Sequence, residues 1–167
     1  MATKALVSLG EYLRTSFPDL DREYRDGEIV ERSWPDIQHA KTQKRLIAIF
    51  SRLEEEGVLL LAFPELRLRI SPVRVLIPDV CVFSPIEPQQ RFPSTPPLVA
   101  IEILSLDDPL TAVREKLEEY RQWGVTHAWL ADPHSRRLYT CTAGLSEVDS
   151  FHLPEFGIEI TPAQIFE

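Results

Sequence analysis

Two nearly uninterrupted apolar segments constrain the fold of this chain more than any other feature. They are Val75–Phe83 and Leu98–Leu104, and each contains a single acidic residue, Asp79 or Glu102. Apolar runs of this length are typical of central strands that are covered on both faces, as in α/β proteins. We therefore predict a sheet that is buried between helices, with one carboxylate in each of two central strands.

The remaining pattern predicts the other elements. Helical spacing of apolar residues indicates a short helix over residues 6–17, a long helix over 36–56 and a third helix opened by Asp108-Pro109 and closed by Gly124. Further strands are predicted over residues 28–33, 57–63, 66–70, 127–131, 137–141, 148–152 and 158–160, with a helical turn after Pro162. This order predicts a mixed β-sheet flanked by helices in a single α/β domain over residues 1–167, with a core of about residues 24–141.

Composition narrows the classes of protein. The net charge of −8 argues against a broad basic nucleic-acid-binding face, although an enzyme can still meet nucleic acid through a local groove and divalent cations. No segment approaches the roughly 20 apolar residues that cross a bilayer, and residues 1–10 lack a signal-peptide pattern. Cys81 and Cys141 have no metal-ligand spacing and are expected to be buried free thiols. We therefore expect a cytoplasmic protein.

The two carboxylates are the main candidates for chemistry. A desolvated carboxylate costs several kcal/mol unless a cation or hydrogen-bond donors compensate it. Two carboxylates that meet in one place suit a hard divalent cation, Mg²⁺ or Mn²⁺. On the third helix, Lys116 lies at the border of the apolar stripe, where its ammonium group can reach the sheet. Two acids and one lysine suit metal-assisted hydrolysis of a phosphodiester bond.

From these residues alone, a purely structural role for the three side chains is about as well supported as a catalytic one. Glu102 and Lys116 could form a structural ion pair, and Asp79 could cap a turn after Pro78.

An ordered series of short motifs shifts this balance. The series resembles the Uma2 (DUF820) family of endonucleases, whose fold is that of the PD-(D/E)XK restriction endonucleases. The resemblance spans about residues 11–141. It rests on Tyr24-Arg-Asp-Gly-Glu-Ile-Val30, Pro78-Asp79, Pro97-Leu-Val-Ala-Ile-Glu-Ile-Leu-Ser105, Glu115-Lys-Leu-Glu-Glu-Tyr120 and Gly124-Val-Thr-His-Ala-Trp-Leu-Ala-Asp-Pro133.

This resemblance implies a role for each site residue. Asp79 and Glu102 would bind the metal, and Lys116 would be the catalytic lysine. The usual motif places a lysine two residues after the second acid, but this chain has Leu104 there. His39 would approach the site from the start of the long helix. The family often has an aspartate one turn before the lysine, whereas this chain has Ala112.

The resulting expectation is a Mg²⁺- or Mn²⁺-dependent endonuclease that hydrolyses DNA, acts as a homodimer and has no membrane partner. Two alternatives stay open. One is a catalytically inactive module of the same fold that binds a protein or nucleic-acid partner, which the acidic charge favours. The other is hydrolysis of a different phosphodiester or of a nucleotide. Serine hydrolysis is unsupported, because Ser105 lacks the Gly-x-Ser-x-Gly setting.

Overall fold

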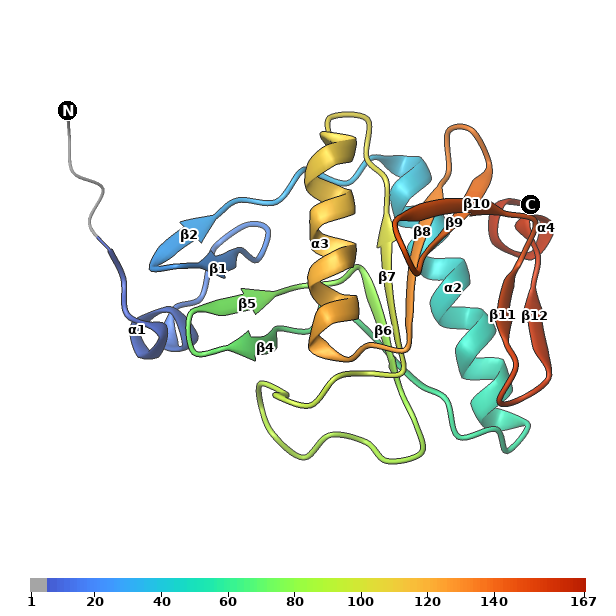
Figure 1. The fold of residues 1–167 in the computed structure, drawn as a ribbon, viewed down its shortest axis with the longest axis horizontal. Helices are drawn as coiled ribbons and strands as arrows, with labels where there is room; N and C mark the ends of the chain where they lie inside the picture. Colours follow the sequence, from blue (N-terminus) through green and yellow to red (C-terminus); the bar gives the residue numbers. More distant parts are fainter. Residues whose placement is uncertain (1–5) are drawn as a thin grey trace.

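A six-stranded mixed sheet forms the centre of the molecule (Figure 1). The computed structural model describes residues 6–167. Residues 1–5 of the segment 1–10, for which no signal peptide is predicted, lie outside the described residues. The strand order is β10-β9-β8-β7-β6-β3, in which only the neighbours β7 and β8 run parallel. The strands are β3 (Leu61–Pro64), β6 (Val80–Phe83), β7 (Val99–Ile103), β8 (His127–Asp132), β9 (Arg137–Cys141) and β10 (Leu145–Val148).

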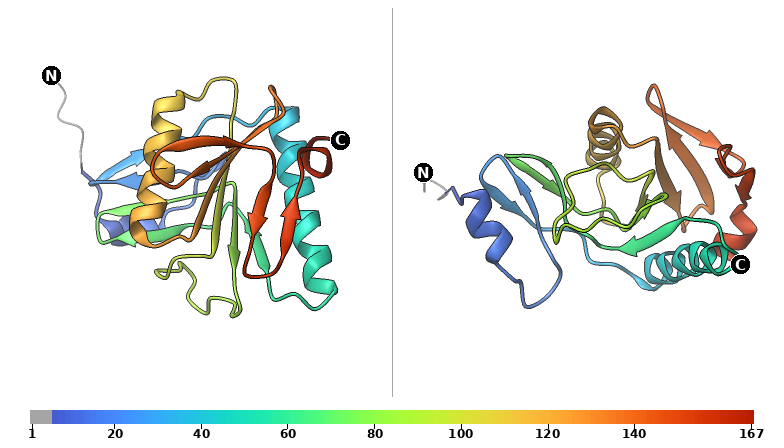
Figure 2. Two further views of the ribbon diagram at one scale, coloured as in Figure 1. Left: turned by 45° about the vertical axis from the view of Figure 1, so that its right-hand side comes forward. Right: turned by 90° about the horizontal axis from the view of Figure 1, so that it is seen from below.

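Two long helices cover opposite faces of this sheet. Seen from below, α2 (Ile37–Glu55) and α3 (Leu110–Trp123) lie on either side of the strands (Figure 2). Side chains alternate along β7, so Val99, Ile101 and Ile103 pack in the cluster that contains α2, while Ala100 packs with α3. By the same alternation, Glu102 points toward α3. The sheet is thus buried on both faces, as the apolar runs predicted.

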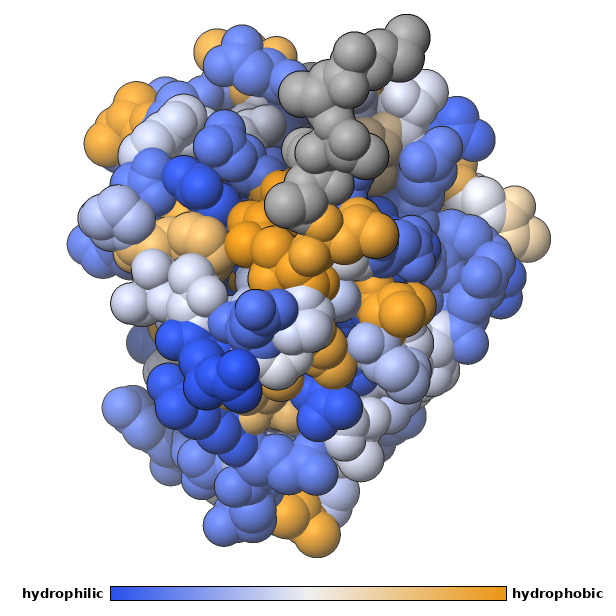
Figure 3. Space-filling view, turned by 90° about the vertical axis from the view of Figure 1, so that its left-hand side faces the viewer, coloured by the Kyte–Doolittle hydropathy of each residue, from blue (hydrophilic) through white to orange (hydrophobic). Residues whose placement is uncertain are grey.

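A second, smaller sheet adjoins the first through β5. Its order is β2-β1-β5-β4, and all its pairs are antiparallel. Its strands are β1 (Glu23–Arg25), β2 (Glu28–Val30), β4 (Leu68–Ser71) and β5 (Arg74–Leu76), and α1 (Leu9–Arg14) packs beside it. Figure 3 views this end of the molecule and shows an orange apolar area at its middle with blue polar residues around it.

The C-terminal segment completes the main core. It forms the hairpin β11 (Phe151–Leu153) and β12 (Ile158–Ile160), followed by α4 (Pro162–Phe166). Phe151 stacks on Trp129 of β8 with ring centroids 4.3 Å apart. Ile165 is buried in the same cluster. The hydrophobic core therefore extends beyond residues 24–141.

Several predicted elements differ in their bounds. Val75–Phe83 is two strands in two different sheets, because Pro78 has no N–H to donate and the chain bends before β6. Pro109, not Asp108, is the N-cap of α3, since the Asp108 carboxylate accepts from the backbone N–H of Ser105 instead.

The other differences are of length. The predicted helix over residues 6–17 is only α1, capped by Ser8. The predicted strand over 28–33 shortens to β2, the one over 57–63 starts later and ends one residue further on, as β3, and the one over 148–152 is divided between β10 and β11. None of the helices formed by residues 6–167 combines the length and the apolar character that crossing a membrane requires.

Candidate active site

Asp79 and Glu102 lie opposite each other on neighbouring chain segments. In the antiparallel pair β6–β7, Val80 is the partner of Ile101, and continuing this register by one residue pairs Asp79 with Glu102. Asp79 also accepts a 2.7 Å hydrogen bond at Oδ2 from the backbone N–H of Ile103. Both carboxylates are almost fully buried. The sheet register therefore brings the two predicted acids together, at the end of β7 that leads into α3.

Lys116 points from α3 toward the same place. Its Nζ lies 3.0 Å from both carboxylate oxygens of Glu102 and donates to the backbone carbonyl of Ile77 at 2.8 Å. One turn further along α3, Tyr120 donates its hydroxyl to Glu102 Oε1 at 2.9 Å. The position of Lys116 at the border of the apolar stripe thus places its ammonium group against the sheet, as predicted.

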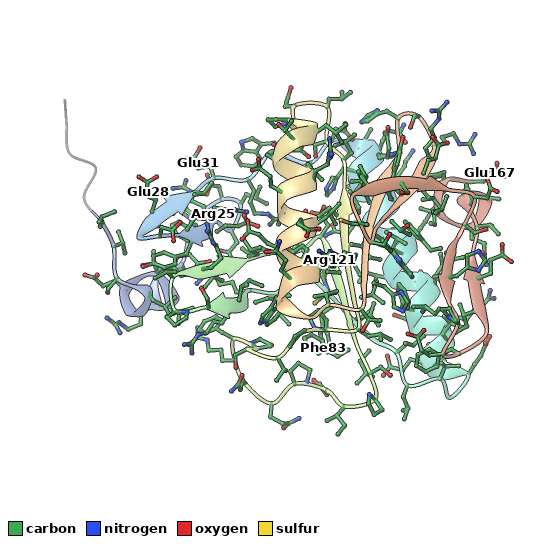
Figure 4. The ribbon with its side chains drawn as sticks, in the orientation of Figure 1. Arg25, Glu28, Glu31, Phe83, Arg121 and Glu167 are labelled. Atoms are coloured by element: carbon green, nitrogen blue, oxygen red, sulfur yellow. The ribbon has the colours of Figure 1, made fainter. Side chains whose placement is uncertain are left out.

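A third buried carboxylate, Glu23 of β1, completes the contacts of Lys116. Its Oε1 lies 2.7 Å from Lys116 Nζ and accepts from the backbone N–H of Ile77 at 3.0 Å. Arg25 of the same strand, labelled in Figure 4, forms ion pairs with Glu23 at 3.2 Å and with Glu119 of α3 at 2.7 Å. The smaller sheet therefore contributes an acid to the site and is tied to α3 by charged side chains.

Cationic and imidazole groups surround Asp79. Arg32, from the segment between β2 and α2, donates to Asp79 Oδ1 at 3.1 Å. His39 Nε2, in the first turn of α2, lies 3.3 Å from the same oxygen. The Asp36 side chain caps α2 by accepting from the backbone N–H of His39 at 2.8 Å, which fixes where the helix starts. Helix capping thus positions the imidazole beside Asp79.

Burial and neighbouring charges separate the pKa values of the two opposed acids. Burial raises the pKa of Glu102 to about 7, and the charges of Asp79 and Glu23 reinforce this against the opposing effect of Lys116. Burial also acts to raise the pKa of Asp79, but the hydrogen bond and charge of His39 and the charge of Arg32 outweigh it and hold that pKa below its ordinary value. The cost of burying the ionised carboxylate is therefore offset at Asp79 but only partly offset at Glu102.

These groups line one pocket of about 240 Å³ that opens at the edge of the sheet. Its walls include all four residues predicted for the site, Asp79, Glu102, Lys116 and His39, together with Glu23 and Arg32. Ala112 also lines it, so the position one turn before Lys116 supplies no acid. Glu23 of β1 is the third buried acid, and the less buried Glu31, Asp108 and Glu115 line the pocket as well. The pocket therefore combines three buried carboxylates with Lys116 and Arg32.

Sequence reasoning missed Glu23, Arg32 and Tyr120. Tyr120 looked like one more apolar residue of the α3 stripe, and its ring is indeed fully buried. Glu23 directly precedes the Tyr24–Val30 motif, and the structure makes it the first residue of β1. Arg32 was expected in the strand over 28–33, but it lies in the irregular segment between β2 and α2.

Other charged and polar side chains are accounted for by structural contacts. Arg67 is buried, pairs with Asp21 at 2.6 Å and lies over the ring of Tyr12. His127 pairs with Glu155 at 2.8 Å. Cys81 and Cys141 are buried free thiols, as predicted.

The fold and the pocket place the protein among the nuclease-like α/β proteins. The crystal structure of a putative nuclease belonging to DUF820 from Anabaena variabilis ATCC 29413 superposes with a TM-score of 0.82 at 22% identity, covering 96% of this chain and 97% of that one. The model of the Uma2 family, described as "Putative restriction endonuclease", matches residues 9–163. The chain belongs to the Uma2 family. No curated protein matches it.

Proposed function

We propose that this pocket hydrolyses phosphodiester bonds of DNA with the help of a divalent cation. The observation that carries the proposal is the convergence of Asp79, Glu102 and Lys116 in one buried pocket of a Uma2-family chain. The description of that family as restriction endonucleases supports DNA as the substrate. The mixture of acids and an ammonium group matches the charges of a phosphodiester and of the water that attacks it.

The residues of the pocket suit a hard cation. Asp79 and Glu102 supply oxygen ligands that face each other, and burial, reinforced by the charges of Asp79 and Glu23, raises the pKa of Glu102, a cost that a bound cation would relieve. Within residues 6–167, no three acidic, histidine or cysteine side chains are arranged to hold a metal by themselves. Mg²⁺ commonly takes one or two carboxylates and completes its shell with water and phosphate oxygens.

Asp79 and Glu102 would hold the cation, with Glu23 close by. A bound Mg²⁺ or Mn²⁺ would polarise a phosphate oxygen and lower the pKa of a bound water.

The chain's own groups have distinct tasks. Burial acts to lower the pKa of Lys116, but Glu102 and Glu23 outweigh it and raise that pKa, so the ammonium stays charged. Its three donors are shared among Glu23, Glu102 and the carbonyl of Ile77. With Glu102 engaged by a cation, one donor of Lys116 would orient the attacking water. Arg32 would meet the phosphate charge beside Asp79.

The test is nicking of supercoiled plasmid DNA with Mn²⁺ or Mg²⁺. We expect activity in the wild type, none in Asp79→Asn or Glu102→Gln, and full activity in Asp149→Asn, which removes an exposed acid outside the pocket. Titration with Mn²⁺ should show binding that both pocket variants lose. Activity that survives both variants would refute the proposal.

The inactive module is the second candidate. Its specific support is that Lys116 and Asp79 already have protein partners and that the chain is acidic. A wild type that binds Mn²⁺ but cleaves neither plasmid DNA nor a nucleotide phosphodiester would favour it.

A homodimer stays a prediction. Its argument is that two sites related by symmetry are the most direct way to cut both strands of a duplex. A cytoplasmic location likewise stays a prediction.

A further inference from the structure

The first part of α2, residues 37–53, carries positive charge only, and the acidic residues Glu54 and Glu55 follow at its C-terminal end. Over residues 37–53 the helix contains Lys41, Lys44, Arg45 and Arg52 and not one acidic residue, in a chain whose net charge is −8. At 100° per residue, Arg45 and Arg52 lie about 40° and about 20° around the helix from Lys41, so the three share one side. Lys41 and Arg52 are exposed and Arg45 is half-buried. Three of the chain's 18 lysine and arginine residues therefore share one side of this helix.

The turn between β8 and β9 adds to this positive surface. Lys41 and Arg45 of the helix and His134 and Arg136 of the turn line one hollow of about 340 Å³, together with Gln38 and other residues. We call Lys41, Arg45, His134 and Arg136 the basic hollow. Two segments about 90 residues apart in the sequence thus come together through the fold of the sheet.

The basic hollow lies at the same edge of the sheet as the acidic pocket. β7 and β8 are parallel and pair Ile103 with Ala131, so Glu102 and the turn that begins after Asp132 lie at the same end of their strands. α2 begins at this edge too, because His39 in its first turn reaches Asp79. Figure 1 shows the start of α2, the β8–β9 turn and the β7–α3 connection together at the top of the molecule.

Two anionic groups already contact this surface. Arg136 pairs with the carboxylate of Glu167 at 2.9 Å, and Arg45 donates to the main-chain oxygen of Glu167 at 2.6 Å. His134 lies 3.1 Å from Asp36. Both partners of the Arg136 pair are more than half exposed, and exposed pairs of this kind contribute little to stability. A phosphate group can therefore replace Glu167 at little cost. Figure 4 shows Glu167 at this side of the molecule, near α4.

We propose that the basic hollow binds the phosphate backbone of DNA and leads the strand to the acidic pocket. This inference rests on the proposed function for the identity of the strand. Lysine and arginine that neutralise phosphates release counterions, and this supplies most of the affinity of non-specific DNA binding. A local hollow beside the pocket explains how a chain of net charge −8 can hold a polyanion.

The test measures DNA binding without cleavage. A fluorescent 20-base-pair duplex is titrated with the protein in EDTA, at several salt concentrations. The double variant Lys41→Gln/Arg136→Gln should bind roughly tenfold more weakly at low salt, and the slope of log K against log salt should fall by about 2, near 0.9 for each lost phosphate contact. Glu167→Gln, which frees Arg136, should bind the duplex a few-fold more tightly.

The matched control is Arg91→Gln. Arg91 is exposed in the proline-rich loop that precedes β7, at the opposite end of that strand. Its loss should leave both the affinity and the salt slope unchanged. Arg91→Gln removes one charge and the double variant removes two. An Arg91→Gln effect as large as half that of the double variant would therefore overturn the inference, because net charge alone would then set the affinity. So would a wild type that does not bind the duplex in 50 mM salt.

The measurement is independent of the proposed chemistry. If the double variant weakens binding but the wild type does not cleave, the basic hollow stands and the nuclease proposal fails. If the wild type cleaves while the double variant binds and cleaves normally, the reverse holds. Because Lys41 and Arg136 are exposed, the double variant should unfold at the wild-type temperature, and circular dichroism can confirm that it is folded.

Discussion

Replacing Glu102 with Gln should stabilise the metal-free protein at pH 8 and change little at pH 5. The burial that raises the pKa of Glu102 from 4.5 to about 7 makes its ionised form costly in the folded state. At about 1.4 kcal/mol per tenfold change in proton affinity, this cost is about 3 kcal/mol when the group is fully ionised in both states. Gln has nearly the same shape and no charge, so it avoids the cost.

The sign follows from proton linkage. Between pH 4.5 and pH 7 the folded protein keeps a proton on Glu102 that the unfolded chain has lost, so this group lowers stability as the pH rises through that window. Above pH 7 the full cost is present. Lys116 does not become an unpaired charge in the variant, because Glu23 stays 2.7 Å from its Nζ. Tyr120 can still donate its hydroxyl to the amide oxygen.

Urea unfolding in EDTA at pH 5 and pH 8 measures this effect. We expect Glu102→Gln to raise the free energy of unfolding by about 3 kcal/mol at pH 8 and by less than about 1 kcal/mol at pH 5. The control Glu87→Gln removes a charge from an exposed loop and should stay within about 0.5 kcal/mol at both pH values. A variant that is equally or less stable than the wild type at pH 8 would refute the electrostatic reasoning.

Two further substitutions test how the backbone positions the site. Asp36→Ala removes the side chain that caps α2 at the N–H of His39, so thermal unfolding should show a loss of about 1 kcal/mol, and an unchanged midpoint would mean that the cap carries no weight. Gly124→Ala places a side chain at φ 115°, with its Cβ 3.3 Å from Pro96, and should lower the free energy of unfolding by more than about 1 kcal/mol. Gly144→Ala, at φ 103° with open space around the Cβ, should lower it by less. Equal losses in the two variants would exclude a role for the Pro96 contact.

The local pattern of the sequence determined much of this protein. Uninterrupted apolar runs predicted a sheet covered on both faces, and helical periodicity predicted α2 and α3 with their C-terminal ends at Glu56-Gly57 and Gly124. The unexpected acids in those runs identified Asp79 and Glu102, because a lone charge in an apolar strand is costly unless the fold compensates it. The ordered motifs identified the family, which the match over residues 9–163 confirms.

The tertiary structure decided what surrounds those acids. Pro78 divides a run that appears continuous, and the resulting bend places Asp79 opposite Glu102 instead of inside a strand. Glu23 reaches Lys116 from 93 positions away in the chain, through a sheet that local periodicity cannot pair with the rest. Sequence spacing carries information only about neighbours along one element, whereas a buried site of this kind is assembled by strand order, register and helix packing.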